Sequence, residues 1–260
     1  MKSNNSSQLQ KEIYVSGFIR SYWIAFITIM STLKTCLSII FTRKTDKNSY
    51  RTKVDHILQS WGKRLLDIIH TQVKVVGKEN LQFTPGRAYM VMCSHTSNYD
   101  IPATFAVLPG SIRMLAKKEL KKIPIFGRAI ESSEMLFIDR QNRKQAIKDL
   151  AEAKQKMEDG IILWVAPEGT RTLGRGKVGK LKKGGFHVAV DTDAIIIPIA
   201  FRGIDDLQLR EKLAWHINKT IECHIGTPID SRGYDKKNLN QLLQVVESQF
   251  KSLVGSEQSS

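Results

Sequence analysis

The feature that most constrains the fold is a regular alternation of short apolar runs and amphipathic segments along residues 70–255. The runs are rich in β-branched residues, as strands are, and cover residues 73–76, 88–93, 111–116, 135–138, 161–165, 195–200 and 220–225. Apolar residues at helical spacing lie between several of these runs, at about residues 98–108, 142–158, 184–191 and 237–253. This rhythm predicts an α/β fold, with a mostly parallel mixed sheet flanked by helices.

A second amphipathic segment, residues 51–70, precedes the first predicted strand. Its apolar side chains recur every three or four residues, which is typical of a helix packed on a core: Val54, Ile57, Leu58, Trp61, Leu65 and Ile68. No linker or internal repeat interrupts the chain after it. We therefore expect two parts, an N-terminal membrane-anchoring helical segment at residues 1–50 and one α/β domain at residues 51–255.

The anchoring prediction depends on residues 13–42, which are apolar except for a few polar positions that include Arg20 and Lys34. The stretch between these two charges, residues 21–33, is shorter than the roughly 20 residues that a spanning helix needs. A helical hairpin lying in the membrane interface therefore fits better, and one oblique span with snorkelling cations remains open. The flank after it is basic, which predicts that the following domain lies on the cytoplasmic side: Arg43, Lys44, Lys47, Arg51 and Lys53.

The charge balance narrows the possible partners. Forty Lys and Arg against 25 Asp and Glu give a net charge of +15, so anionic lipid headgroups, phosphorylated small molecules and nucleic acid all suit the surface field. The chain shows no nucleic-acid-binding motif, which argues against nucleic acid as the partner. Three widely spaced cysteines, Cys36, Cys93 and Cys223, predict neither a disulfide framework nor a zinc site.

A polar cluster follows the predicted strand at residues 88–93. It contains His95 and, five residues later, Asp100, at the strand-to-helix turn where α/β sheets place their sites. This spacing lets the carboxylate bind one imidazole nitrogen and leaves the other as a base, as in a serine protease triad without its serine. Such a spacing is common by chance, so taken alone it favours an ordinary capped loop residue at His95.

Two further clusters contain cations. After the predicted strand at 161–165, the turn Pro167-Glu168-Gly169-Thr170-Arg171 offers a glycine for close backbone approach and an arginine suited to phosphate. A local Glu168–Arg171 ion pair is the alternative interpretation. Between residues 113 and 140, basic side chains are interleaved with leucine, isoleucine and phenylalanine, which suits a lipid headgroup beneath its acyl chains.

Taken together, these clusters resemble the conserved blocks of the glycerolipid acyltransferase family, specifically its 1-acylglycerol-3-phosphate acyltransferases. The matching residues, in block order, are His95 and Asp100; Lys117, Leu120, Gly127 and Arg140; Pro167, Glu168, Gly169, Thr170 and Arg171; and Ile196, Ile197, Pro198 and Ile199. The resemblance covers about residues 70–205. It departs from the family pattern at Ala166, where a bulky aromatic is common, and at Thr172, where serine is usual.

The resemblance implies transfer of a fatty acyl group from acyl-CoA or acyl carrier protein to the sn-2 hydroxyl of 1-acylglycerol-3-phosphate (lysophosphatidic acid), giving phosphatidic acid. His95 would be the general base and Asp100 would orient it, with no covalent acyl-enzyme, no metal and no cofactor. The implied substrate-binding residues are Lys117, Arg140, Glu168, Gly169, Thr170 and Arg171. Glycerol-3-phosphate or another lysophospholipid as acceptor remains an alternative, as does a non-catalytic protein that binds membranes.

Overall fold

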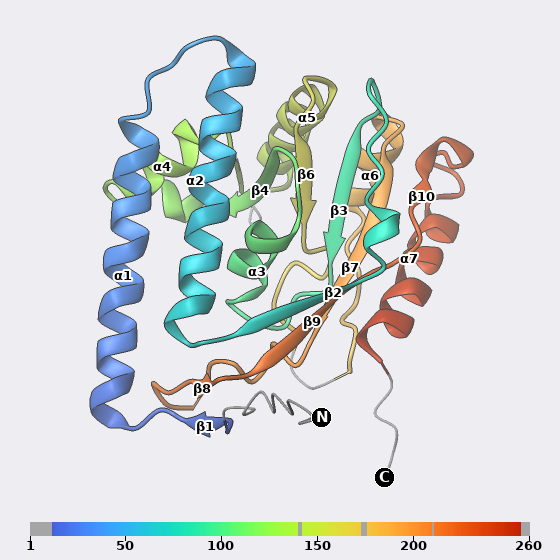
Figure 1. Ribbon diagram of the computed structural model, residues 1–260. Helices are drawn as coiled ribbons and strands as arrows, with labels where there is room; N and C mark the ends of the chain where they lie inside the picture. The colour runs from blue at the N-terminus through green and yellow to red at the C-terminus, as the bar shows by residue number, and fades with distance from the viewer. Residues whose placement is uncertain (1–11, 140–141, 173–175, 210, 256–260) are drawn as a thin grey trace, which may run out of the picture.

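The computed structural model describes residues 12–139, 142–172, 176–209 and 211–255. Within these ranges the chain forms an eight-stranded mixed sheet in the order β2-β9-β7-β3-β6-β4-β5, with β10 paired to β7 (Figure 1). The strands are β2 (Gln72–Val76), β3 (Tyr89–Cys93), β4 (Ile112–Lys117), β5 (Leu136–Ile138), β6 (Ile162–Val165), β7 (Ile195–Arg202), β9 (Thr220–Ile225) and β10 (Ile229–Asp230). The block β7-β3-β6-β4-β5 is parallel throughout, which confirms the predicted α/β fold.

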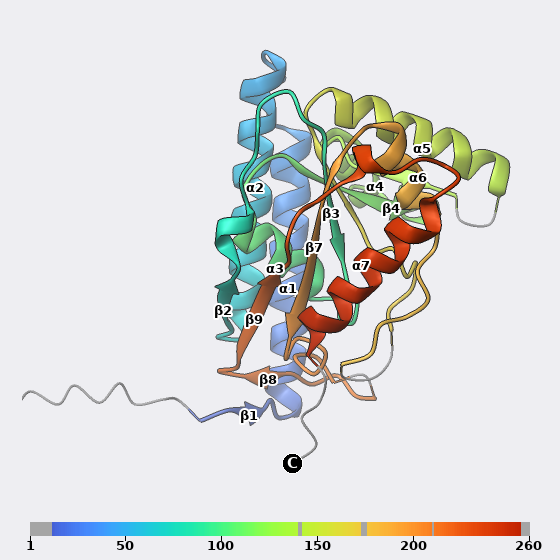
Figure 2. The ribbon, with the colours of Figure 1, turned by 90° about the vertical axis from the view of Figure 1, so that its right-hand side faces the viewer.

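Helices cover both faces of this sheet, as Figure 2 shows. One face carries α1 (Phe18–Ile40), α2 (Lys47–Ile68) and α3 (Asp100–Val107), and the other carries α5 (Arg143–Glu158), α6 (Gly184–Asp191) and α7 (Leu239–Val254). The alternation of side chains along β3 explains the two layers, because successive residues point to opposite faces. Tyr89, Val91 and Cys93 join the core beneath α2 and α3, whereas Met90 and Met92 join the core beneath α5, α6 and α7.

The first two helices form an antiparallel pair, with α1 packed on α2 and on the short helix α4 (Phe126–Ser132). Because α1 is continuous from Phe18 to Ile40, the turn follows it rather than falling inside residues 13–42, where a hairpin was expected. Helix α2 begins at Lys47, four residues before the predicted start, since the Asp46 side chain accepts a hydrogen bond from the Ser49 amide at 3.0 Å. By length and composition, α1 is the one helix among the described residues that could cross a membrane.

The start of α1 is attached to a distant part of the chain. Strand β1 (Tyr14–Val15) pairs with β8 (His216–Ile217) in a separate two-stranded sheet. Ser16 extends this contact, because its amide donates to the Trp215 carbonyl at 2.8 Å and its hydroxyl accepts from the Trp215 amide at 2.9 Å. The start of α1 is thus fixed to the α/β domain through residues 215–217.

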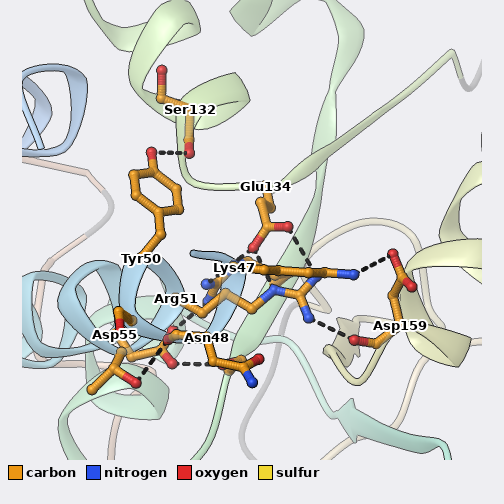
Figure 3. A network of polar contacts seen from close by, with 12 residues as sticks. Lys47, Asn48, Tyr50, Arg51, Asp55, Ser132, Glu134 and Asp159 are labelled. Atoms are coloured by element: carbon orange, nitrogen blue, oxygen red, sulfur yellow. Dashed lines mark hydrogen bonds and ion pairs between the residues drawn. The ribbon is translucent and has the colours of Figure 1, made fainter. Parts of the chain in front are cut away.

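A network of charged side chains fixes α2 to the sheet (Figure 3). The side chain of Arg113, on β4, is fully buried, and its Nη1 donates to Oδ1 of Asp55 on α2 at 2.6 Å. One turn earlier on α2, Arg51 donates from Nε and Nη2 to the two carboxylate oxygens of Glu134 at 2.7 and 2.9 Å, and from Nη1 to the Asp159 carbonyl at 2.6 Å. These bonds join α2 to β4, to the turn after α4 and to the end of α5.

Candidate active site

Strand order explains why blocks that are far apart in sequence meet at one edge of the sheet. Strands β3, β6 and β4 are adjacent and parallel, so their carboxyl ends lie side by side. His95 follows β3, the turn at residues 166–171 follows β6, and Lys117 ends β4. Such an edge is where open α/β sheets bind ligands. Arg140, predicted to follow β5 at the same edge, lies outside the described residues.

His95 and Asp100 form the predicted pair. Nδ1 of His95 lies 2.7 Å from Oδ2 of Asp100, which is the first residue of α3 and is fully buried. The same oxygen accepts the backbone amides of Thr96 and Ser97, each at 2.9 Å, so the carboxylate cannot rotate away from the ring. With Nδ1 donating to a carboxylate, Nε2 carries the lone pair, and the arrangement suits a general base.

The His95 ring is held from a second side as well. It packs edge-on against Trp164 of β6, with ring centroids 6.1 Å apart and an interplanar angle of 89°. Its side chain keeps 19% of its surface exposed, whereas Asp100 keeps none. The base can therefore meet a substrate while its orienting carboxylate stays out of water.

Glu168 connects the turn after β6 to the turn after β3. It is only 4% exposed, and its Oε1 accepts from the Ser94 hydroxyl at 3.3 Å while its Oε2 accepts from the Thr172 hydroxyl. The Thr172 amide also donates to the His95 carbonyl at 2.8 Å. Thr172 stands where the family pattern usually has serine, and its hydroxyl still donates to Glu168. The role of Glu168 in substrate binding stays a prediction, and the contacts add a role in positioning His95.

Burial raises the pKa of Glu168 from its ordinary 4.5 to about 7, although hydrogen bonds from Ser94 and from the backbone at Gly179 and His95 oppose the rise. The folded carboxyl therefore keeps its proton at a pH where the unfolded carboxyl has lost it. This contribution to stability is present below pH 4.5 and is lost as the pH rises to about 7. We expect the thermal midpoint of Glu168→Gln to vary less than that of the wild type over this window.

The matched control for this measurement is Glu247→Gln, which removes a partly exposed carboxylate paired with Lys251 within α7. Its midpoint should follow the wild-type curve across the same pH series. Parallel curves for Glu168→Gln and the wild type would show that Glu168 titrates alike in the folded and unfolded chains.

Cations surround the remainder of this turn. Gly169 has a φ of 75°, and a Cβ there would come within 2.7 Å of Nζ of Lys182, so the lysine side chain lies over the glycine. Thr170, Arg171 and Lys117 are exposed at the same edge. Lys182 was not among the predicted site residues. Nothing in the sequence singled out Ser94, because the Ser94–Glu168 contact joins residues 74 positions apart. The edge thus presents a base beside cations. This arrangement suits a substrate that carries both a phosphate and the hydroxyl to be deprotonated.

No group of three or more His, Cys, Asp or Glu side chains within the described ranges could hold a metal ion. All three cysteines are free and buried, and burial raises the pKa of the Cys93 and Cys223 thiols. A high thiol pKa disfavours the reactive thiolate.

Comparison with known proteins shows which family the chain resembles. A family model described as Acyltransferase matches residues 72–202. The 1-acyl-sn-glycerol-3-phosphate acyltransferase of Haemophilus influenzae is 34% identical over 152 residues, which are 57% of this chain and 61% of that protein. A putative 1-acyl-sn-glycerol-3-phosphate acyltransferase of Caenorhabditis elegans is 30% identical over 226 residues, 86% of this chain and 77% of that protein. The match thus spans less than two thirds of the bacterial relative and more than two thirds of the nematode one.

A solved structure extends the likeness to the N-terminal helices. The crystal structure of the lysophosphatidic acid acyltransferase PlsC from Thermotoga maritima superposes with a TM-score of 0.73 at 28% identity, covering 91% of this chain and 92% of that chain. The family match spans residues 72–202, a range that includes His95, Lys117 and the turn at 166–171. This chain therefore belongs to the Acyltransferase family.

Proposed function

We propose that this acyltransferase moves a fatty acyl group from acyl-CoA or acyl carrier protein to the sn-2 hydroxyl of 1-acylglycerol-3-phosphate, giving phosphatidic acid. The observation that carries the proposal is the His95–Asp100 pair beside exposed cations at one sheet edge. The names of the Haemophilus and Thermotoga relatives support this acceptor. The acyl donor is a substrate, and the reaction requires no further cofactor.

The residues suggest a direct transfer. Nε2 of His95 takes the proton of the acceptor hydroxyl as its oxygen attacks the thioester carbonyl carbon. The tetrahedral intermediate then expels the thiolate by breaking the C–S bond, and the imidazolium returns the proton to sulfur. Asp100 holds the ring in one tautomer and stabilises the imidazolium between the two steps. No bond to the protein forms at any point.

The cations provide the phosphate site in this proposal. Lys117 ends β4, and Arg171 and Lys182 lie in the segment that leads from the neighbouring strand β6 to α6. The arginine offers two parallel donors to phosphate oxygens. A phosphate held there would leave the sn-2 hydroxyl to reach toward His95. Glycerol-3-phosphate carries the same phosphate as 1-acylglycerol-3-phosphate. This geometry therefore also admits it as the alternative acceptor.

Membrane association is part of the proposal, because both acceptor and product are membrane lipids. The outer face of α1 is apolar and exposed, with more than half of the surface accessible on Phe18, Ile19, Tyr22, Trp23, Phe26 and Ile29. We propose that this face lies in the bilayer and that the basic residues after it keep the α/β domain on the cytoplasmic side.

The test is acyl transfer by the purified full chain in mixed micelles. Labelled acyl-CoA and labelled acyl carrier protein are each offered with 1-acylglycerol-3-phosphate, glycerol-3-phosphate or lysophosphatidylcholine. We expect label in phosphatidic acid, because the first acceptor supplies both the phosphate monoester and the acyl chain. If labelled product formed only when glycerol-3-phosphate was the acceptor, the result would support the alternative acceptor. Transfer to lysophosphatidylcholine alone would contradict the proposed phosphate site.

A further inference from the structure

A groove of about 580 Å³ lies where the start of α1 passes the end of α2. From α1 it is lined by Ile19, Arg20, Trp23, Ile24 and Ile27. From the end of α2 it is lined by Ile68 and His70. Its walls are apolar and open to the outside, since Ile19 is 85% exposed and Trp23 is 60% exposed.

The polar groups of this groove are basic. Arg20 is exposed, and its guanidinium carbon lies over the Tyr14 ring, 5.3 Å from the ring centroid. His70 adds a second nitrogen-bearing side chain, held at a φ of 51° in the turn between α2 and β2. None of the described residues that line the groove is acidic, and Arg20 has no carboxylate partner in the described part of the chain.

We propose that this groove binds one anionic phospholipid, with its phosphate on Arg20 and an acyl chain against Trp23 and the isoleucines. Arginine binds phosphate oxygens through parallel N–H donors, and an apolar wall beside a cation matches a lipid's chain and headgroup. This binding is separate from the acyl-transfer reaction. It would hold the α1–α2 pair on an anionic bilayer, at the end of the molecule toward which β3 and β6 run (Figure 1).

A second groove on α1 provides the matched comparison. It measures about 390 Å³ and contains one cation, Lys34, among apolar residues such as Leu33, Leu37 and Phe41. Every residue that lines it belongs to α1 or to the position directly after it. A single helix surface offers one wall to a lipid, whereas the Arg20 groove has walls from two elements, so we assign the lipid to the latter.

Tryptophan fluorescence can report on the Arg20 groove directly. Of the four tryptophans, Trp164 and Trp215 are buried at 5% and 3% exposed, Trp61 is partly buried, and Trp23 lines the groove. The full chain is reconstituted in vesicles that contain brominated phosphatidylglycerol or brominated phosphatidylcholine at equal mole fraction. Quenching that disappears in Trp23→Phe is assigned to the groove.

We expect the anionic brominated lipid to be preferred about fivefold at Trp23, the ratio that corresponds to ~1 kcal/mol for one arginine at an anionic surface. Arg20→Gln should lower the ratio to one, Arg20→Lys should keep part of it, and Lys34→Gln should leave it unchanged. Acyl transfer in detergent checks that each variant is folded.

Equal quenching of the wild type by the two lipids overturns the proposal, whatever the variants do. An equal loss of the preference for anionic lipid in Arg20→Gln and Lys34→Gln also overturns it, because that result would indicate a general charge effect. Because the first comparison uses only the wild-type chain and Trp23→Phe, the proposal can fail even if Arg20→Gln does not fold. Failure of acyl transfer in detergent by the wild type would instead contradict the proposed function and leave the quenching result standing.

Discussion

Alanine in place of His95 is expected to lower kcat for acyl transfer by about 10²–10⁴-fold, the usual contribution of a positioned general base. Nε2 is the ring nitrogen that can accept the hydroxyl proton, because Nδ1 is bound to Asp100. KM for the acceptor should change little, since the base interacts with the hydroxyl chiefly in the transition state. Steady-state kinetics in mixed micelles measure both constants.

Two companion variants separate this mechanism from a loss of folding. Asp100→Asn should also lower kcat strongly, because a carboxamide can donate to Nδ1 and favour the wrong tautomer. His56→Ala removes an exposed histidine of α2 and should leave kcat unchanged. If His95→Ala kept kcat within a few-fold of the wild type, the general-base mechanism would be wrong, whatever the acceptor.

The second large effect is expected on stability. Asp55→Asn should reduce the free energy of unfolding by about 3–5 kcal/mol, the usual cost of leaving a buried charge without its partner. Arg113 is fully buried, its Nε and Nη2 already lack hydrogen-bond partners, and its next carboxylate oxygen, on Glu134, is 3.8 Å away. Denaturant unfolding of the full chain in detergent measures the loss.

A double variant tests the cause of that loss. Asp55→Leu combined with Arg113→Met removes both charges, so most of the stability should return, because apolar replacement of a buried pair is often neutral or favourable. As a control, Glu247→Gln breaks an exposed ion pair with Lys251 and should change stability by less than ~1 kcal/mol. A double variant as unstable as Asp55→Asn would show that packing, rather than the unpaired charge, sets the cost.

The network is also sensitive to acid. Burial raises the pKa of Glu134, but the hydrogen bonds and charge of Arg51, with the charge of Arg113, outweigh burial and bring the pKa below its ordinary value. A carboxylate of lowered pKa stabilises the fold above its unfolded pKa, and this stabilisation is lost as the pH falls through the folded value. The α2 attachment is thus weakest in acid.

Local patterns in the sequence predicted most of the sheet and the order of its elements. Each predicted strand between residues 73 and 225 has a counterpart that differs by a few residues at its ends. The central strands β3 and β6 are buried and parallel, and such strands give continuous apolar runs. Helix α4 was missed, since it has seven residues, too few to show a helical period. Strands β1, β8 and β10 were missed for the same reason, as each has two residues.

The site was predicted in outline and not in its connections. His95 and Asp100 are five residues apart, so their spacing was visible, and their contact is confirmed at 2.7 Å. The contacts of Glu168 with Ser94 and of Arg113 with Asp55 join residues 74 and 58 positions apart. Such pairs arise only when the strands assemble, and no periodicity in one sequence encodes them.

The pairing of β1 with β8 has a consequence for synthesis of the chain. Ser16 and Trp215 are 199 residues apart, so at roughly 5–20 residues per second a ribosome needs about 10–40 s to make the second after the first. During that interval the apolar α1 has left the ribosome, and the strand that fixes its start does not yet exist. A nearby bilayer or a chaperone must therefore shelter α1 first, and the α/β domain closes onto a helix that is already in place.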